Sequence, residues 1–187
     1  MKKTNCILSL VLLIVLSSIG SAQAQSKYID KNGTLTFEAS EELFEEVKAT
    51  NASVTAILNI DTNEIASLGL VKGFRFKNAL MEEHFNENYI ESETYPKATF
   101  RGKLLDFNFS DLSENMTDIA VDGKLELHGK EKEIRTTLKI KKSGDSIIIQ
   151  GSFNVTPDDF DIEIPNIVKN KIAKEINVSL AFKLSQK

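Results

Sequence analysis

The feature that most constrains the fold of this sequence is the alternation of apolar and polar residues, which recurs along most of the chain. Alternation with a period of two is typical of β-strands that bury one face. The clearest examples are residues 34–39, 53–60, 119–128, 134–140, 147–155 and 177–184. Residues 65–76 and 97–107 alternate less cleanly, and we expect strands there too. The sequence therefore predicts eight strands.

Eight strands with one apolar face each have few ways to bury those faces. Short turns, such as residues 128–130 and 142–145, make neighbouring strands antiparallel. The chain can then form a two-sheet sandwich or a closed up-and-down barrel, and the alternation alone does not separate these architectures. The difference matters for function, because an eight-stranded barrel can hold a small elongated ligand, whereas a sandwich fills that space with side chains.

Three further segments are expected to interrupt the strands. Ser40 is a candidate N-cap for a short helix over residues 41–49, and Asn78 for a helix that runs to Ile90. The apolar residues of the second helix recur at helical spacing on one side, with acidic residues on the other. Residues 165–174 are expected to form a third helix or a loop before the last strand.

Composition excludes several classes of protein. The 187 residues include 23 basic and 27 acidic side chains, and the resulting net charge of −4 argues against a nucleic-acid-binding protein. A charged fraction of 27% excludes a polytopic membrane protein. The two histidines leave little room for metal sites or catalytic triads that depend on this residue.

The first 24 residues have the pattern of a secretory signal peptide. Two lysines precede an apolar run over residues 7–19, and Ala22 and Ala24 suit cleavage before Gln25. The run is shorter than the roughly 20 residues that a membrane-spanning helix needs. We therefore expect residues 25–187 to form a single domain, periplasmic or secreted. This mature chain would contain no cysteine and, having lost both lysines of the leader, would carry a net charge of −6.

Several stretches of the mature chain form a recognisable set of motifs. Residues 74–92 lead into Tyr-Pro-Lys-Ala-Thr-Phe-Arg-Gly at 95–102, and three shorter stretches follow in order at 121–129, 158–162 and 171–178. Together these stretches closely resemble the YceI-like family of periplasmic lipid-binding proteins. The block from the predicted helix to the Tyr-Pro-Lys-Ala-Thr-Phe strand is the most specific part of the resemblance.

The resemblance implies a lipocalin-like, eight-stranded antiparallel barrel whose elongated apolar cavity holds an isoprenoid chain, such as that of a polyprenyl phosphate or a quinone. It also implies a secreted or periplasmic carrier without catalytic activity. The family's N-terminal strand usually runs into a His-Leu-Gly stretch, where this chain has Phe-Glu-Ala-Ser-Glu-Glu-Leu-Phe at residues 37–44. We therefore expect the cavity mouth to differ on that side.

In such a barrel, the inward apolar rows become the wall of the cavity. An isoprenoid chain binds there through burial of its carbon atoms, at about 0.8 kcal/mol per CH₂ group. We expect the helix over residues 79–90 to pack against the barrel or close one end, with Leu80, Met81 and Phe85 directed inward. The rest of the predicted lining consists of Phe37, Phe74, Phe76, Phe100, Leu125, Leu127, Phe153 and Phe182.

Two further residue types bear on the ligand. A phosphate head group would require cations at the mouth, since phosphate pairs with Arg and Lys. The candidates are Arg75, Lys77, Arg101 and Lys103. The inward rows also contain Gly69, Gly102, Gly123 and Gly151. Glycine in a strand marks either a bend or a close approach to the backbone, so barrel geometry or a ligand can explain them. In the second case, tryptophan at Gly123 or Gly151 would abolish uptake and leave a folded barrel.

His84 is the sharpest candidate for chemistry, because Glu87 lies three positions further along the same helix. A complete metal site needs three or four ligands, so we favour a histidine that anchors the helix to the barrel and predict no metal site. His128, before Gly129 at a strand end, is expected to make a turn-stabilising hydrogen bond. The acidic run over residues 158–161 lacks the glycine and the closing glutamate of a calcium loop, so we expect a solvated turn.

The sequence thus predicts a non-enzymatic carrier of an amphiphilic, isoprenoid-type lipid, with no cofactor, no nucleic-acid partner and no transmembrane segment once the leader is removed. Two alternatives stay open. One is a protein-interaction or stress-related barrel with a filled core, which predicts no extractable lipid. The other is an enzyme built around His84, which predicts retained metal. The sequence leaves open the identity of the lipid and the oligomeric state, for which a homodimer is one option.

Overall fold

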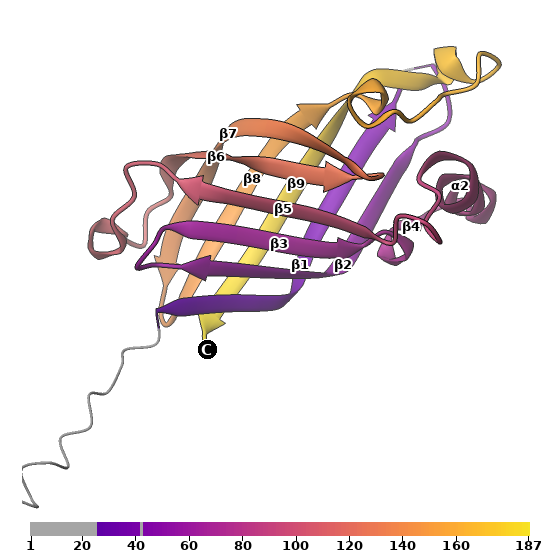
Figure 1. Cartoon of the computed structure of the whole chain (residues 1–187). Helices are drawn as coiled ribbons and strands as arrows, with labels where there is room; N and C mark the ends of the chain where they lie inside the picture. The colour runs from indigo at the N-terminus through magenta and orange to yellow at the C-terminus, as the bar shows by residue number, and fades with distance from the viewer. Residues whose placement is uncertain (1–25, 42) are drawn as a thin grey trace, which may run out of the picture.

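The computed structural model describes residues 26–41 and 43–187, and its strands form one closed barrel with loops and a short helix at its ends (Figure 1). The leader expected over residues 1–24 lies outside the described residues. Within the two described ranges, no helix is both long enough and apolar enough to cross a membrane.

Eight strands build the barrel. They are β1 (Lys27–Ser40), β2 (Lys48–Asn59), β3 (Glu64–Leu70), β5 (Lys97–Leu104), β6 (Thr117–Leu127), β7 (Lys130–Ser143), β8 (Ser146–Val155) and β9 (Ile172–Gln186). Each pairs antiparallel with the next along the chain, and β1 also pairs with β9, which closes the ring. A two-residue strand, β4 (Arg75–Phe76), adds to one end of β2. The predicted eight-stranded antiparallel barrel is confirmed, and the sandwich is excluded.

The alternation in the sequence becomes the inside and the outside of the barrel. In β2, Val54, Ala56 and Leu58 have no exposed surface, whereas Ile57 between them is exposed on the outer wall. This arrangement follows from the pleat of a strand, which sends successive side chains to opposite faces. A slip of one residue in register would put the whole apolar row into solvent.

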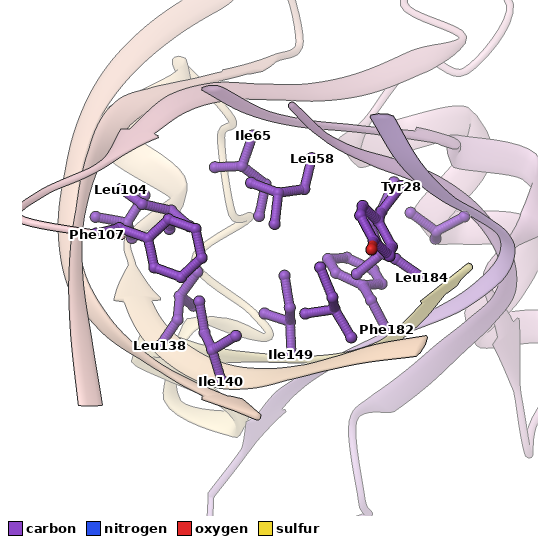
Figure 2. Close-up of a cluster of buried hydrophobic side chains, with 14 residues drawn as sticks. Tyr28, Leu58, Ile65, Leu104, Phe107, Leu138, Ile140, Ile149, Phe182 and Leu184 are labelled. Atoms are coloured by element: carbon purple, nitrogen blue, oxygen red, sulfur yellow. The ribbon is translucent and has the colours of Figure 1, made fainter. Parts of the chain in front are cut away.

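Side chains fill one end of the barrel (Figure 2). Leu58, Ile140, Ile149 and Leu184, which come from four different strands, meet there without any exposed surface. The connection between β5 and β6 covers this end and contributes the buried Phe107. This end of the barrel is therefore closed by its own side chains.

The paired glycines of β5 and β6 make room for an aromatic ring and not for a ligand. Gly102 lies directly opposite Gly123 in the ladder. A Cβ atom at either position would lie 2.8 or 2.6 Å from Cζ of Phe100, whose ring covers both. At Gly123 it would also lie 2.5 Å from the backbone oxygen of Arg101. The expectation that tryptophan at Gly123 blocks uptake in a folded barrel is therefore wrong, because the backbone itself leaves no space. Gly151 differs, because a Cβ there would meet the end of the flexible Leu138 side chain at 2.5 Å and backbone atoms only at 3.4 Å or more, so the expectation for tryptophan at this position stays a prediction.

The helix predicted over residues 41–49 does not form. The ladder between β1 and β2 runs on to the pair Glu38–Lys48, and Ala39 N–H donates to the carbonyl of Val47 at 2.8 Å. The hydroxyl of Ser40, the expected helix cap, accepts instead from Val47 N–H at 3.0 Å. Strand pairing with a distant segment thus overrides a weak local helix signal, and the described residues between the strands form a hairpin loop.

The strand predicted over residues 65–76 is broken. β3 ends at Leu70, a 3-10 turn, η1, occupies Val71–Gly73, and β4 follows. The buried side chain of Asn51 causes the break, because its amide donates to the Leu70 carbonyl at 2.9 Å. Gly73 packs against that amide, where a Cβ would lie 2.5 Å from Nδ2.

The helix predicted from Asn78 is confirmed, with a change of type. Asn78 is its N-cap, and its Oδ1 accepts from Leu80 N–H at 2.9 Å. The α-helix α2 covers Ala79–His84 and continues as a π-helical turn, η2 (Phe85–Tyr89). Residues 165–171 form a loop that ends in the 3-10 turn η5 (Lys169–Lys171) before β9.

We predict that Gly123→Ala destabilises the barrel by about 1–3 kcal/mol, the usual cost of overpacking. Gly69→Ala is the matched control on an inward row, because a Cβ there meets Val54 at 3.4 Å, an ordinary contact. Its effect should stay within about 1 kcal/mol. Urea unfolding of both variants measures the difference. Equal stabilities would contradict the close packing of Phe100 over the glycine pair.

Candidate ligand-binding cavity

The end of the barrel opposite the filled core contains a cavity of about 630 Å³. Its wall is formed by the inner faces of β1, β3 and β5–β9, and its mouth by the β1–β2 loop, α2 and the connection that precedes β9. The volume lies within the range of about 300–1,000 Å³ that is usual for small-molecule sites. The lining is predominantly apolar, with few polar side chains.

Inward-facing side chains distinguish the hollow end from the filled end. Leu125, Leu127 and Phe153 point into the barrel, yet each is only half-buried. Ile140 and Ile149 occupy equivalent inward positions at the filled end and have no exposed surface. Protein interiors are normally packed to the density of organic crystals, so half-buried inward side chains indicate unoccupied apolar space.

Four phenylalanines gather on the side of the cavity next to α2. The ring of Phe37 from β1 stacks on that of Phe85, with centroids 5.2 Å apart. Phe74 and Phe76 complete the group at 5.3 and 5.6 Å from Phe37. Aromatic pairs at such separations stabilise by about 0.5–1.5 kcal/mol beyond their burial. The group fixes the helical segment to the barrel.

The π-helical turn keeps the inner face of the helical segment directed at the cavity. Ile90 N–H donates to the Phe85 carbonyl at 3.0 Å, the spacing of five residues that defines a π-helix. Such a turn is wider than an α-helical one, so residues four apart stay closer to one line. Met81, Phe85 and Tyr89, each four apart, all line the cavity.

A gap between β7 and β8 is closed by the 3-10 turn η4 (Pro157–Phe160). The ladder of these two strands ends at the pair Leu138–Gly151, and β7 continues to Lys130 paired only with β6. Phe160 fills the space with 1% of its surface exposed. The acidic run predicted to be a solvated turn is therefore only partly solvated.

Ion pairs and a capping box hold η4 in place. The side chain of Asp159 accepts from Thr156 N–H at 2.7 Å and pairs with Lys132 of β7. Asp161, in the left-handed conformation that ends the turn, pairs with Lys130 at 2.6 Å. Both lysines belong to the part of β7 that has lost its β8 partner. These contacts therefore replace the missing ladder.

His128 connects three separate segments. Its Nδ1 lies 2.9 Å from the carbonyl oxygen of Phe160, and its ring packs edge-on against Tyr95 at 4.5 Å between centroids. Its Nε2 is buried without a hydrogen bond, and Glu91 Oε2 lies 3.8 Å away. The predicted turn-stabilising hydrogen bond is present, but it reaches η4, 32 positions along the chain. The sequence holds no signal for such a contact.

All the residues predicted to line the cavity lie on its wall or at its mouth. They are Phe37, Phe74, Phe76, Leu80, Met81, Phe85, Phe100, Leu125, Leu127, Phe153 and Phe182. Their contact with a ligand stays a prediction. Leu80 sits at the edge and is largely exposed, and Phe182 lies at the floor next to the filled core. The prediction missed Phe44 and Val47, which the expected helix concealed, and Ile164, Val168 and Ile172 before β9.

The charged groups at the mouth differ from those expected. The candidate cations Arg75, Lys77, Arg101 and Lys103 do not line the cavity. Arg75 pairs with Glu82, and Lys77 pairs with Glu46. Arg101 and Lys103 are exposed on β5. Among the described residues, the charged side chains that do line it are Glu45 and Lys171, together with the ionisable His84. The described residues therefore place no cluster of cations at the mouth that could bind a phosphate group.

The sequence predicted that His84 anchors the helix to the barrel. In the structure, its side chain is instead exposed at the mouth of the cavity. Within residues 26–41 and 43–187, no three His, Cys, Asp or Glu side chains come together as a metal site would require. An arrangement of His84 with Glu87 alone supplies too few ligands for a stable site.

The fold and the cavity define the class of this protein: a closed antiparallel barrel with one packed end and one hollow apolar end. The model of the YceI-like domain matches residues 17–184, and the chain therefore belongs to the YceI-like family. A comparison with curated proteins gave no match.

Three solved structures illustrate the shared fold. A polyisoprenoid binding domain from Saccharophagus degradans, implicated in plant cell wall breakdown, is 16% identical, with a TM-score of 0.74 over 87% of this chain and 99% of that one. Burkholderia cenocepacia BcnA is 14% identical, with a TM-score of 0.67 over 81% and 96%. The Campylobacter jejuni YceI protein is also 14% identical, with a TM-score of 0.62 over 77% and 87%. At these identities, the similarity establishes the fold alone.

We predict that Leu184→Ala and Leu127→Ala differ in cost, although both remove the same atoms from an inward side chain. Leu184 is fully buried, so its truncation should cost about 2–5 kcal/mol. Leu127 already borders open space, so its truncation should cost clearly less than that. Denaturant unfolding measures both values. Equal losses would show that the second end is packed.

The ion pair of Asp159 predicts a pH-dependent contribution to stability. Burial acts to raise the pKa of this carboxyl, but hydrogen bonds from Lys132 and Thr156 outweigh burial and hold its pKa below the usual value. Ionised Asp159 therefore stabilises the fold above its unfolded pKa of about 4, and this contribution is lost as the pH falls through the lower folded pKa. Asp159→Asn should lower the melting temperature at pH 7, with a smaller difference from wild type near pH 2–3. A difference that does not change with pH would contradict this role.

Proposed function

We propose that this protein is a periplasmic or secreted carrier, without catalytic activity, that holds the apolar chain of an amphiphilic isoprenoid-type lipid in its barrel. The observation that carries the proposal is the hollow end of the barrel. Apolar side chains that a filled core would bury completely, such as Leu125 and Phe153, are left half-exposed around open space. A bound apolar chain would complete their burial.

The chemistry of the lining favours a long apolar ligand over a polar one. Association costs an estimated 4–15 kcal/mol in lost freedom of motion, and burial of a CH₂ group returns about 0.8 kcal/mol. A chain of about 20 buried carbon atoms therefore offsets the upper estimate. The aromatic group around Phe37 and Phe85 suits the flat, partly unsaturated segments of an isoprenoid.

The comparisons support the proposal at the level of the family. The solved structure from Saccharophagus degradans is described as a polyisoprenoid binding domain. This chain belongs to the same family and has a cavity of suitable character. The alternative of a protein-interaction barrel with a filled core agrees less well with the structure, because only one end is filled.

The first test is mass spectrometry of the purified mature protein, in its native state and after organic extraction. We expect a stoichiometric added mass that extracts as a prenyl lipid. Lipid-free protein is then incubated with geranylgeraniol and with eicosanol, a straight-chain alcohol of the same carbon number. Stoichiometric uptake of the first and weaker uptake of the second would support an isoprenoid ligand. Absence of uptake of either would overturn the proposed function.

We predict that Ala98→Trp abolishes the uptake of geranylgeraniol. Ala98 lies on the cavity wall and points inward from β5, so an indole there fills part of the binding space. Arg101→Trp is the matched control, because Arg101 is exposed on the outer face of the same strand. Native mass spectrometry measures the bound fraction, and circular dichroism checks that both variants fold. Equal uptake by both variants would place the ligand outside the cavity.

The proposed location has its own test. Expression of the full chain in a Gram-negative host should give a periplasmic product, because Ala22 and Ala24 suit signal peptidase. Its intact mass should correspond to a chain that starts at Gln25. Replacement of Ala24 by arginine should block processing and leave the precursor mass. A cytoplasmic product that retains residues 1–24 would contradict the proposal.

A further inference from the structure

Large apolar side chains project into solvent around the mouth of the cavity. Leu43 and Phe44 lie in the β1–β2 loop with 92% and 43% of their surface exposed, and Leu80 on α2 is 57% exposed. Ile167, in the loop before β9, is 84% exposed. These three segments lie at the same end of the barrel (Figure 1) and also supply lining residues of the cavity.

The apolar collar formed by Leu43, Phe44, Leu80 and Ile167 differs from scattered surface hydrophobes. Single exposed apolar residues are normal on a soluble protein. Here, however, Leu43 and Ile167 are the two most exposed large apolar side chains of the described residues. Their chain neighbours Phe44 and Val168 line the apolar cavity. The apolar lining thus continues outward onto the surface that surrounds the mouth.

The charges next to Ile167 are basic and unpaired. Lys169, Lys171 and Lys174 follow it within seven residues, and their side chains form no ion pair or hydrogen bond with any other described residue. Glu163 is the single carboxylate between residues 163 and 174. This segment therefore combines an apolar tip with a local excess of free ammonium groups.

Two of the acidic groups on the other side of the mouth are held by partners. Asn78 Nδ2 donates to Glu45 at 3.2 Å, and Lys77 pairs with Glu46. Glu41 has no partner among the described residues, and Glu42 lies outside them. The electrostatic contrast between the two sides leaves the segment around Ile167 as the part that attracts anions.

We propose that this end of the protein docks on a lipid bilayer that contains anionic lipid. Ile167 and Leu43 enter the interface, and the lysines after Ile167 lie against lipid phosphates. This inference rests on the proposed function. An isoprenoid chain can then pass between the bilayer and the cavity without crossing water, which avoids the cost of exposing its carbon atoms.

The form of the collar favours a bilayer over a protein partner. Protein interfaces have a contiguous apolar centre from which charged residues are depleted. The collar instead consists of separate tips on three segments, and lysines follow Ile167, the tip on the last of these segments. Apolar tips flanked by lysines are typical of segments that lie in a membrane interface.

The test measures binding of the mature protein to vesicles of phosphatidylcholine, alone or with phosphatidylglycerol. We expect sedimentation with the anionic vesicles, weakened by high salt because the attraction is electrostatic. Ile167→Ser should lower the partition coefficient by about fivefold or more, since it removes the apolar tip. Lys169→Gln combined with Lys174→Gln should lower it on anionic vesicles only. Leu70→Ser is the matched control, because Leu70 is 54% exposed on the barrel wall outside the collar, and it should have no effect.

A transfer assay separates this inference from the proposed function. Ile167→Ser should slow the uptake of geranylgeraniol from anionic vesicles but leave its uptake from an ethanol dispersion unchanged. Normal uptake from the dispersion with no vesicle binding by wild type would overturn the docking and leave the carrier function standing. No uptake from either source would overturn the carrier function itself. A wild-type dimer in sedimentation velocity that Ile167→Ser dissociates, without vesicle binding, would show that the collar joins two copies and would also overturn the docking.

Discussion

The pairing of β1 with both β2 and β9 is the constraint on which the rest of this structure depends. It turns a linear succession of antiparallel strands into a ring and leaves no strand edge of the barrel open to aggregation. It also fixes the width of the barrel interior, which side chains can fill or leave hollow. β1 meets both neighbours by shifting register around Gly33, against which the ring of Phe182 packs. The closure therefore creates both the core and the space for a ligand.

The two ends of the ring use the same inward alternation for opposite purposes. At one end, Leu58, Ile140 and Ile149 meet across the axis and the β5–β6 connection covers them (Figure 2). At the other end, the β7–β8 ladder stops early, and η4 closes the wall from the side with Phe160. The barrel wall therefore stays continuous while the interior of the barrel stays open, because η4 fills the gap between the two strands and does not extend across the barrel axis.

The helical segment and η4 are joined to each other as well as to the barrel. His128 bonds to the Phe160 carbonyl and packs on Tyr95, which follows the helical segment in the chain. Phe85 on that segment stacks on Phe37 of β1. The cover over one side of the cavity is thus supported by packing at both of its ends, whereas the large apolar side chains of the collar around the mouth are exposed.

The sequence alone determined which residues face the interior, because the period of two in a strand leaves no choice of side once one apolar row is buried. That is why the strand residues of the predicted lining, such as Phe37 and Leu125, face the inside of the barrel, and why the helix capped by Asn78 could be recognised. Contacts between distant segments were decided only by the tertiary structure. Lys48 pairs with Glu38 in the β1–β2 ladder and replaces a predicted helix, Asn51 ends β3, and Phe100 occupies the space over Gly123. Local propensity amounts to a few tenths of a kcal/mol per residue, and strand pairing and burial across the ring outweigh it.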